Sequence, residues 1–84
     1  MNVSIVPHAR DRMVFWQVSE ERVKRALLAP DHVRQGDRPE RMVAQSQFAN
    51  EALPVHVVYT SPQRDEYIVV TVYRGRAKKG VSAL

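Results

Sequence analysis

The residue types in this chain that could do chemistry together lie near its two ends. His8 and Arg12 are four positions apart near the start, and Tyr73 and Arg74 end the last apolar run. A histidine exchanges protons near neutral pH, a tyrosine can donate one, and arginines hold a phosphate as charge builds on it. Metal-free cleavage of RNA requires such a base, acid and cations. The candidate catalytic residues are therefore His8, Arg12, Tyr73 and Arg74.

Each candidate also has a structural interpretation. A histidine at the start of a helix is often only a solvated neighbour of the cap, and Tyr73 could simply close the edge of a sheet. No histidine in the chain has a ligand partner at metal-binding spacing. For His32 and His56 we favour a structural role. With no cysteine and only three glycines, the chain predicts no metal site and no cofactor.

The positive charge is concentrated at the end of the chain. All nine Asp and Glu precede Val70, so the formal net charge of +4 falls on the last fifteen residues. Clustered cations neutralise phosphates and release counterions, which predicts a surface for RNA. The alternative is a solvated basic tail that begins at about residue 75. The predicted RNA-binding residues are Thr71, Arg76, Lys78 and Lys79.

Length and composition indicate the class of protein. Eighty-four residues predict a single domain over residues 1–84, and 44% hydrophobic residues are typical of a globular chain. The first residues lack the basic lead and apolar run of a secretion signal. No apolar stretch approaches the roughly 20 residues that a membrane helix needs. We therefore expect a cytoplasmic protein that does not bind membranes.

The first third of the chain has a helical pattern. Pro7 suits the first turn of a helix, and Ala9, Met13 and Trp16 recur at a spacing that places them on one stripe. Ser19 is a typical N-cap for a second helix, and Pro30 must follow its end. We expect helices near residues 7–15 and 19–28.

Beyond Pro30 the hydrophobic period changes from about 3.6 to 2, as strands require. Strands are predicted over 32–35, 41–48, 55–60 and 66–73, and their short connections favour antiparallel pairing. The sequence therefore predicts an α+β fold with both helices on one face of the sheet. The expected core is Met13, Trp16, Val23, Leu27, Phe48, Val57, Ile68, Val70 and Val72.

Several segments resemble one family of small bacterial domains of unknown function. The opening Pro7–Met13 resembles the His-Ala-x-x-Arg-Met start of that family. The resemblance continues through residues 18–23 and 26–30 and ends in a Val-x-Val-Tyr-Arg strand at Val70–Arg74. That family is similar to BrnT-type toxins and, more distantly, to the RelE/ParE superfamily of toxins.

The resemblance implies two helices packed on a curved antiparallel sheet, and from the change of hydrophobic period we expect that sheet to have three to four strands. It also implies a toxin-like, metal-independent endoribonuclease that is restrained by a small antitoxin protein. His8 and Arg12 match the opening motif, and Thr71, Tyr73 and Arg74 match the closing strand. The strand around His56 lacks the Lys/Arg array of ribosome-dependent RelE toxins, which weighs against ribosome-dependent cleavage.

A non-catalytic binding module is the alternative, either a ParE-like gyrase inhibitor or a protein-interaction domain. The two interpretations differ in whether His8, Arg12, Tyr73 and Arg74 converge within reach of one phosphate. Neighbouring residues of a strand face opposite sides of the sheet. If Val72 faces the helices, His8 must reach round the sheet edge to join Tyr73.

Overall fold

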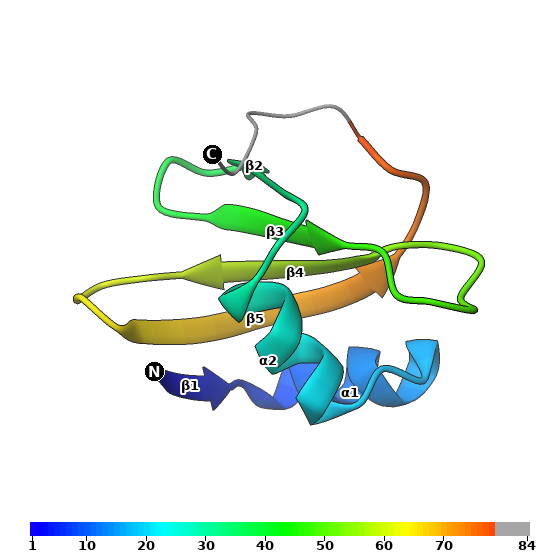
Figure 1. Ribbon diagram of the computed structural model, residues 1–84. Helices are drawn as coiled ribbons and strands as arrows, with labels where there is room; N and C mark the ends of the chain where they lie inside the picture. The colour runs from blue at the N-terminus through cyan, green and yellow to red at the C-terminus, as the bar shows by residue number, and fades with distance from the viewer. Residues whose placement is uncertain (79–84) are drawn as a thin grey trace.

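The computed structural model describes residues 1–78 and shows one sheet with two helices packed against it (Figure 1). The elements, in chain order, are β1 (Asn2–Ile5), α1 (Pro7–Trp16), α2 (Glu20–Leu28), β2 (His32–Gln35), β3 (Met42–Ser46), β4 (Val55–Thr60) and β5 (Glu66–Arg74). The expected α+β class and the two N-terminal helices are confirmed.

The prediction of three to four antiparallel strands is wrong. The sheet has five strands in the order β1-β5-β4-β3-β2, and it is mixed because β1 runs parallel to β5. The other three pairs are antiparallel, as their short connections favour. The strand that the sequence did not reveal is β1, which is only four residues long and pairs with a segment more than sixty positions away, Asn2 with Glu66.

The two helices begin where the sequence predicts. Pro7 is at the start of α1, and the Ser19 side chain accepts a hydrogen bond from the backbone N–H of Arg22 at 3.1 Å, as an N-cap does. In Figure 1, α2 crosses in front of the sheet, while α1 runs along the side of β5. Within residues 1–78, neither helix has the length and apolar composition that crossing a membrane requires.

The core lies between the helices and one face of the sheet. Of the expected core residues, six are buried and Trp16 is half-buried against them. Ile68 and Val70 are only half-buried, and Val69 is buried in their place. The reason is a β-bulge: Val58 pairs with Thr71, but its neighbour Tyr59 pairs with Val69. The extra residue in β5 reverses the alternation of side chains along the strand. The confirmed core residues are Met13, Val23, Leu27, Phe48, Val57 and Val72.

Candidate functional site

The face of the sheet turned away from the helices, which we call the open face, carries a row of polar side chains. Val57 and Val72 belong to the core, so their neighbours His56 and Tyr73 point to the open face. Gln45 pairs with His56 and His56 pairs with Tyr73, so these three side chains stand side by side on β3, β4 and β5. Thr71, two positions before Tyr73, belongs to the same face.

Arg34 of β2 joins this row through three hydrogen bonds. Its Nη1 donates to Gln45 Oε1 at 3.1 Å. Its Nη2 is 3.1 Å from His56 Nδ1 and donates to the Tyr73 hydroxyl at 2.9 Å. The imidazole and phenol rings are stacked, with centroids 4.6 Å apart and planes 3° from parallel. One arginine therefore connects three strands.

His56 is fully buried, and its contacts define its protonation. Arginine can only donate, so Nδ1 must accept from Arg34; the Gly75 carbonyl can only accept, so Nε2 donates to it across 3.0 Å. The ring is therefore neutral with its hydrogen on Nε2. Burial lowers the pKa of His56 from its ordinary value of 6.5, and the nearby charges of Arg34 and Lys78 lower it further. The hydrogen bond to Gly75 acts in the opposite direction.

A cavity of about 190 Å³ opens beside this network, and we call it the basic pocket. Val43, Val58 and Thr71 form its floor on the open face. Its walls come from the β2–β3 loop on one side and the segment after β5 on the other. The charged and hydroxyl-bearing residues that line it are Arg34, Asp37, Arg41, Thr71, Tyr73 and Lys78.

Both walls are held by hydrogen bonds to the sheet. The Gln35 amide donates to the carbonyls of Arg38, Pro39 and Arg41 and so closes the β2–β3 loop. Gly36 donates its N–H to the Arg41 carbonyl at 2.8 Å, and a side chain at Gly36 would lie only 3.2 Å from Arg41 Cβ. On the other side, the Lys78 backbone N–H donates to Gln45 Oε1 at 3.0 Å.

The charge of Arg34 is uncompensated. The side chain is half-buried, its three acceptors are a neutral amide, imidazole and phenol, and no carboxylate of residues 1–78 forms an ion pair with it. Removing a charge from water without a counter-charge is costly. Its Nε hydrogen and one Nη1 hydrogen are left over from the three bonds. The pocket is therefore suited to an anion that supplies the missing negative charge.

Three of the residues predicted from sequence meet at this pocket. Tyr73, Thr71 and Lys78 all line it. Because the Tyr73 oxygen accepts from Arg34, its own hydrogen is left for a further acceptor. Arg76 is exposed on the segment that leads to Lys78. Lys79 lies outside the residues that the structure describes.

The remaining candidates lie on the helix side. His8 is exposed near the start of α1, and Arg12 is half-buried, with its guanidinium 4.7 Å from the centre of the Phe15 ring. Arg74 points away from Tyr73 and donates to the carbonyls of Trp16 and Gln17 and to Glu51. Within the described part of the chain, none of these three lines the basic pocket, so the structure does not bring His8 and Tyr73 to one phosphate.

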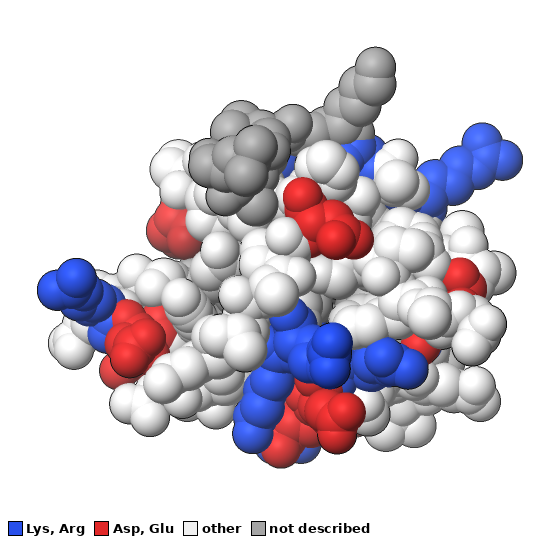
Figure 2. Space-filling view, viewed as in Figure 1, with Lys and Arg blue, Asp and Glu red and all other residues white. Residues whose placement is uncertain are grey.

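The helix-bearing face has a different electrostatic character. In Figure 2, which shows that face, Lys and Arg side chains in the lower part lie beside Asp and Glu. Among the ion pairs of the helices, the Glu20 carboxylate is 3.0 Å from Arg10 and 3.6 Å from Lys24. The hydrogen bond from Arg10 and the charge of Lys24 lower the pKa of the Glu20 carboxyl. Positive charge on this face is thus partly neutralised.

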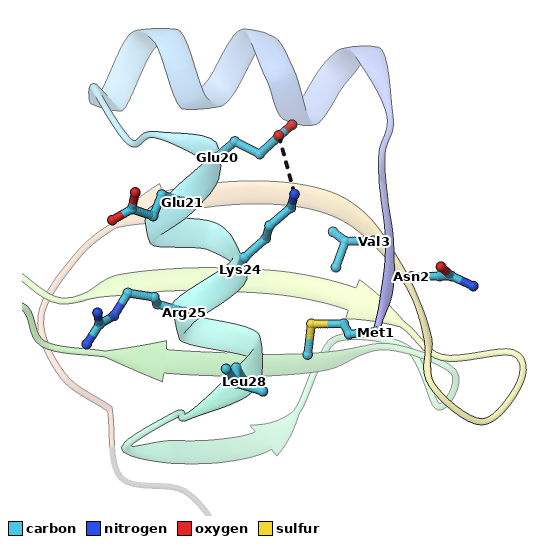
Figure 3. A pocket seen from close by; sticks show the side chains of 8 residues that line it. All are labelled: Met1, Asn2, Val3, Glu20, Glu21, Lys24, Arg25 and Leu28. Atoms are coloured by element: carbon cyan, nitrogen blue, oxygen red, sulfur yellow. Dashed lines mark ion pairs between the residues drawn. The ribbon is translucent and has the colours of Figure 1, made fainter.

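A second hollow lies between β1 and α2 (Figure 3). Its volume of about 750 Å³ is larger than that of the basic pocket, and Met1, Val3 and Leu28 give it an apolar character. The Glu20–Lys24 ion pair lies at its rim. Because a carboxylate already accompanies the cation there, this hollow is less suited to an anion than the basic pocket.

The charged pocket residues that the sequence did not reveal are Arg34, Asp37 and Arg41, and Gln45 of the adjoining network was not revealed either. Each lies in a segment that reads as a solvated strand or loop, and only the pairing register places them beside Tyr73. A usable signal existed at His56, a histidine in the middle of an otherwise apolar strand. A buried polar side chain in such a strand needs partners on the same face.

The fold and the pocket define an α+β protein with a cationic cavity on the open face of its sheet. The chain belongs to the family described as a domain of unknown function (DUF4258), whose model matches residues 5–74. The expected membership of a family of unknown function is thereby confirmed. Neither the curated proteins nor the solved structures yielded a match.

The arrangement has chemical capacity for anion binding and proton donation. Arg34, Arg41 and Lys78 supply cations, and Tyr73 supplies a free hydroxyl hydrogen. Asp37 is the carboxylate among the lining residues. For a metal, the described residues contain no cluster of three or more His, Asp or Glu side chains.

Proposed function

We propose that the protein is a toxin-like, metal-independent endoribonuclease that holds an RNA phosphate in the basic pocket. The observation that carries the proposal is the half-buried Arg34, whose charge has only neutral partners and which lies beside two further cations. Phosphate oxygens match the donor geometry of arginine and neutralise its charge. The resemblance to BrnT-type and RelE/ParE toxins adds the toxin role and a small antitoxin as partner.

The chemistry assigns Tyr73 as the acid. The ribose 2′-oxygen attacks phosphorus and loses its proton, the bond from phosphorus to the 5′-oxygen breaks, and that oxygen takes the Tyr73 hydrogen. Arg34 then faces the phenolate that remains, and its charge stabilises it. Asp37 is assigned as the acceptor of the 2′-hydroxyl proton, since it is the carboxylate that lines the pocket. The products are a 2′,3′-cyclic phosphate and a 5′-hydroxyl.

Cleavage of single-stranded RNA in the presence of a chelator tests this assignment. Tyr73→Phe should lower the cleavage rate by about 100-fold or more, because general acid catalysis typically contributes that much. Tyr67→Phe is the matched control, since Tyr67 lies on the same strand but packs against Tyr59. We expect the control to cleave like the wild type. If Tyr73→Phe cleaves as fast as the control, Tyr73 is not the acid.

A non-catalytic RNA-binding module is the second candidate. Its supporting observation is that His56, the histidine beside the pocket, has both ring nitrogens occupied, while His8 is exposed on α1. Binding of RNA without cleavage by the purified wild type would favour this candidate. The toxin role is tested separately: expression of the wild type should arrest bacterial growth, and expression of Tyr73→Phe should not.

A further inference from the structure

We infer that His56 is a positioning residue of the basic pocket: it holds the Arg34 guanidinium against Tyr73, and protonation of its ring releases both side chains. This inference rests on the proposed function for its link to RNA. The hydrogen bonds themselves exist without RNA. His56 is fully buried and does not line the pocket, so it acts only through its neighbours.

The direction of each hydrogen bond follows from two groups in the series: the Gly75 carbonyl, which can only accept, and the Arg34 guanidinium, which can only donate. The Gly75 carbonyl can only accept, so His56 Nε2 carries the hydrogen and Nδ1 is left as an acceptor. Arg34 fills that acceptor and uses the same Nη2 to donate to the Tyr73 oxygen. The last free hydrogen of the series is therefore the Tyr73 hydroxyl hydrogen. Arg34 itself sets the direction at the phenol, because a guanidinium can only donate, and His56 contributes by holding Arg34 in place.

Stacking adds a second constraint on the same two residues. The rings of His56 and Tyr73 are parallel, with centroids 4.6 Å apart, so the phenol cannot tilt toward β4. Gly75 lies close to both rings: a Cβ there would be 3.7 Å from the Tyr73 ring and 3.9 Å from His56 Nε2. The chain therefore turns away from β5 immediately beside the two rings.

A proton on Nδ1 would disrupt this arrangement. The groups that face His56 are Arg34 from β2, Tyr73 from β5, neutral Gln45 from β3, and Arg76 and Lys78 from the segment after β5. No carboxylate within residues 1–78 is among them. A protonated ring would place an N–H against the Arg34 N–H and a positive charge among cations. Arg34 would then lose an acceptor and move away from Tyr73.

Two substitutions separate the two nitrogens of His56. The side-chain oxygen of asparagine lies near the position of Nδ1, so His56→Asn keeps an acceptor for Arg34 and loses the bond to Gly75. The side-chain nitrogen of glutamine lies near the position of Nε2, so His56→Gln keeps the donor to Gly75 and loses the acceptor. His32→Asn is the matched control, because His32 is exposed in the same row of the open face.

NMR of the uniformly ¹⁵N-labelled protein without RNA tests the inference first. At pH 7.5 the His56 ring should show the Nε2–H tautomer, and the Arg34 side-chain N–H signals should be sharp. Those signals should broaden as His56 takes up its proton. In His56→Asn they should stay sharp over the same pH range, whereas in His56→Gln they should be broad throughout. The inference would be overturned if the Arg34 signals did not change as His56 takes up its proton. It would also be overturned if the His56 ring were the Nδ1–H tautomer.

Binding of a 2′-O-methyl RNA oligonucleotide, which cannot be cleaved by 2′-attack, then links the series to the pocket. The RNA affinity of the wild type should fall as the pH drops and His56 takes up its proton. His56→Asn should retain the wild-type affinity within about threefold and should not show this fall at low pH. His56→Gln should bind about tenfold more weakly. Equal losses in both variants would contradict a positioning role. If the wild type does not bind RNA, the proposed function fails, and the NMR result still decides whether His56 positions Arg34.

Discussion

Arg34 and Arg74 are both half-buried arginines, but their partners differ in charge. Arg74 has the Glu51 carboxylate and two backbone carbonyls. Arg34 has an amide, an imidazole and a phenol, all neutral. A charge that is neutralised within the fold has a structural role, whereas a half-buried charge without a counter-charge favours an external anion. This contrast is the reason why the proposed phosphate site is at Arg34 and not at Arg74.

The buried, neutral state of His56 predicts a specific pH dependence of stability. Its pKa is lowered in the folded protein, so below its ordinary value of 6.5 the unfolded chain binds a proton that the native state resists. The free energy of unfolding should therefore fall as the pH drops below 6.5, by at most about 1.4 kcal/mol per pH unit. Urea unfolding at pH 7, 6 and 5 measures this effect.

The matching comparison uses His56→Asn, which should lose this component of the pH dependence. Glu20, whose pKa is also lowered, contributes in a separate window, because its stabilising charge is lost only when the pH falls below about 4.5. Parallel pH profiles for the wild type and His56→Asn between pH 7 and 5 would show that the imidazole is not held neutral.

At the scale of elements, β5 serves both faces of the molecule. Tyr73 and Thr71 point into the basic pocket, and Arg74 binds the end of α1. Glu51, in the β3–β4 connection, pairs with Arg74 and also with Arg22 of α2, at 3.1 Å. These contacts connect the end of β5 to both helices and so hold the backbone at Tyr73 in position.

Substitution of Arg74 should therefore affect stability before RNA binding. Arg74→Met should lower the free energy of unfolding by about 1–3 kcal/mol, because the hydrogen bonds of a charged group are lost. The Glu51 carboxylate retains its ion pair with Arg22 in this variant. Arg76→Met, at an exposed position, should change it by less than about 0.5 kcal/mol. Denaturant unfolding measures both. If Arg74→Met has wild-type stability but no longer binds RNA, Arg74 contacts the phosphate and its role is not structural.

The buried face of α2 offers a second element-scale test. Leu27 is 8% exposed in the core, and its neighbour Leu28 is 73% exposed. Leu27→Ala should cost about 2–5 kcal/mol, because it leaves a cavity between α2 and the sheet. Leu28→Ala should cost less than about 0.5 kcal/mol. Similar unfolding midpoints for the two variants would contradict the orientation of α2.

At the scale of the whole molecule, the distribution of charge matters more than the net charge of +4. On the helix-bearing face, cations stand beside carboxylates (Figure 2). The basic pocket on the open face combines Arg34, Arg41 and Lys78 with a single carboxylate, Asp37. For the proposed RNA ligand, we therefore expect the open face to be the side that attracts the phosphates.

This distribution predicts the salt dependence of RNA binding. Each phosphate contact that is removed should flatten the slope of log K against log salt by about 0.7 for a single strand. Arg41→Gln and Lys78→Gln combined should therefore reduce the slope by about 1.4. Arg64→Gln is the control, because Arg64 is exposed in the β4–β5 loop, outside the lining of the pocket. An equal reduction in the control would mean that binding depends on net charge alone.

The sequence by itself determined the local elements. Pro7 and Ser19 mark the starts of the two helices, and the change of period after Pro30 marks the strands. These features depend on backbone geometry and on side chains within a few positions of one another, which a sequence displays directly. Residue type and charge also named Thr71, Tyr73 and Lys78, three residues that line the basic pocket.

Only the tertiary structure decided how the strands align, because register depends on partners far apart in the chain. The parallel pairing with β5 makes β1 a strand, although its four residues are too few to show a strand pattern in the sequence. Because of the bulge between Val58 and Tyr59, Val69 is buried in the core in place of Ile68 and Val70. The same register placed Arg34 beside Tyr73, 39 positions apart, and left His8 on the helix side. Side chains on neighbouring strands meet only when the register matches, so the basic pocket is a property of the assembled sheet.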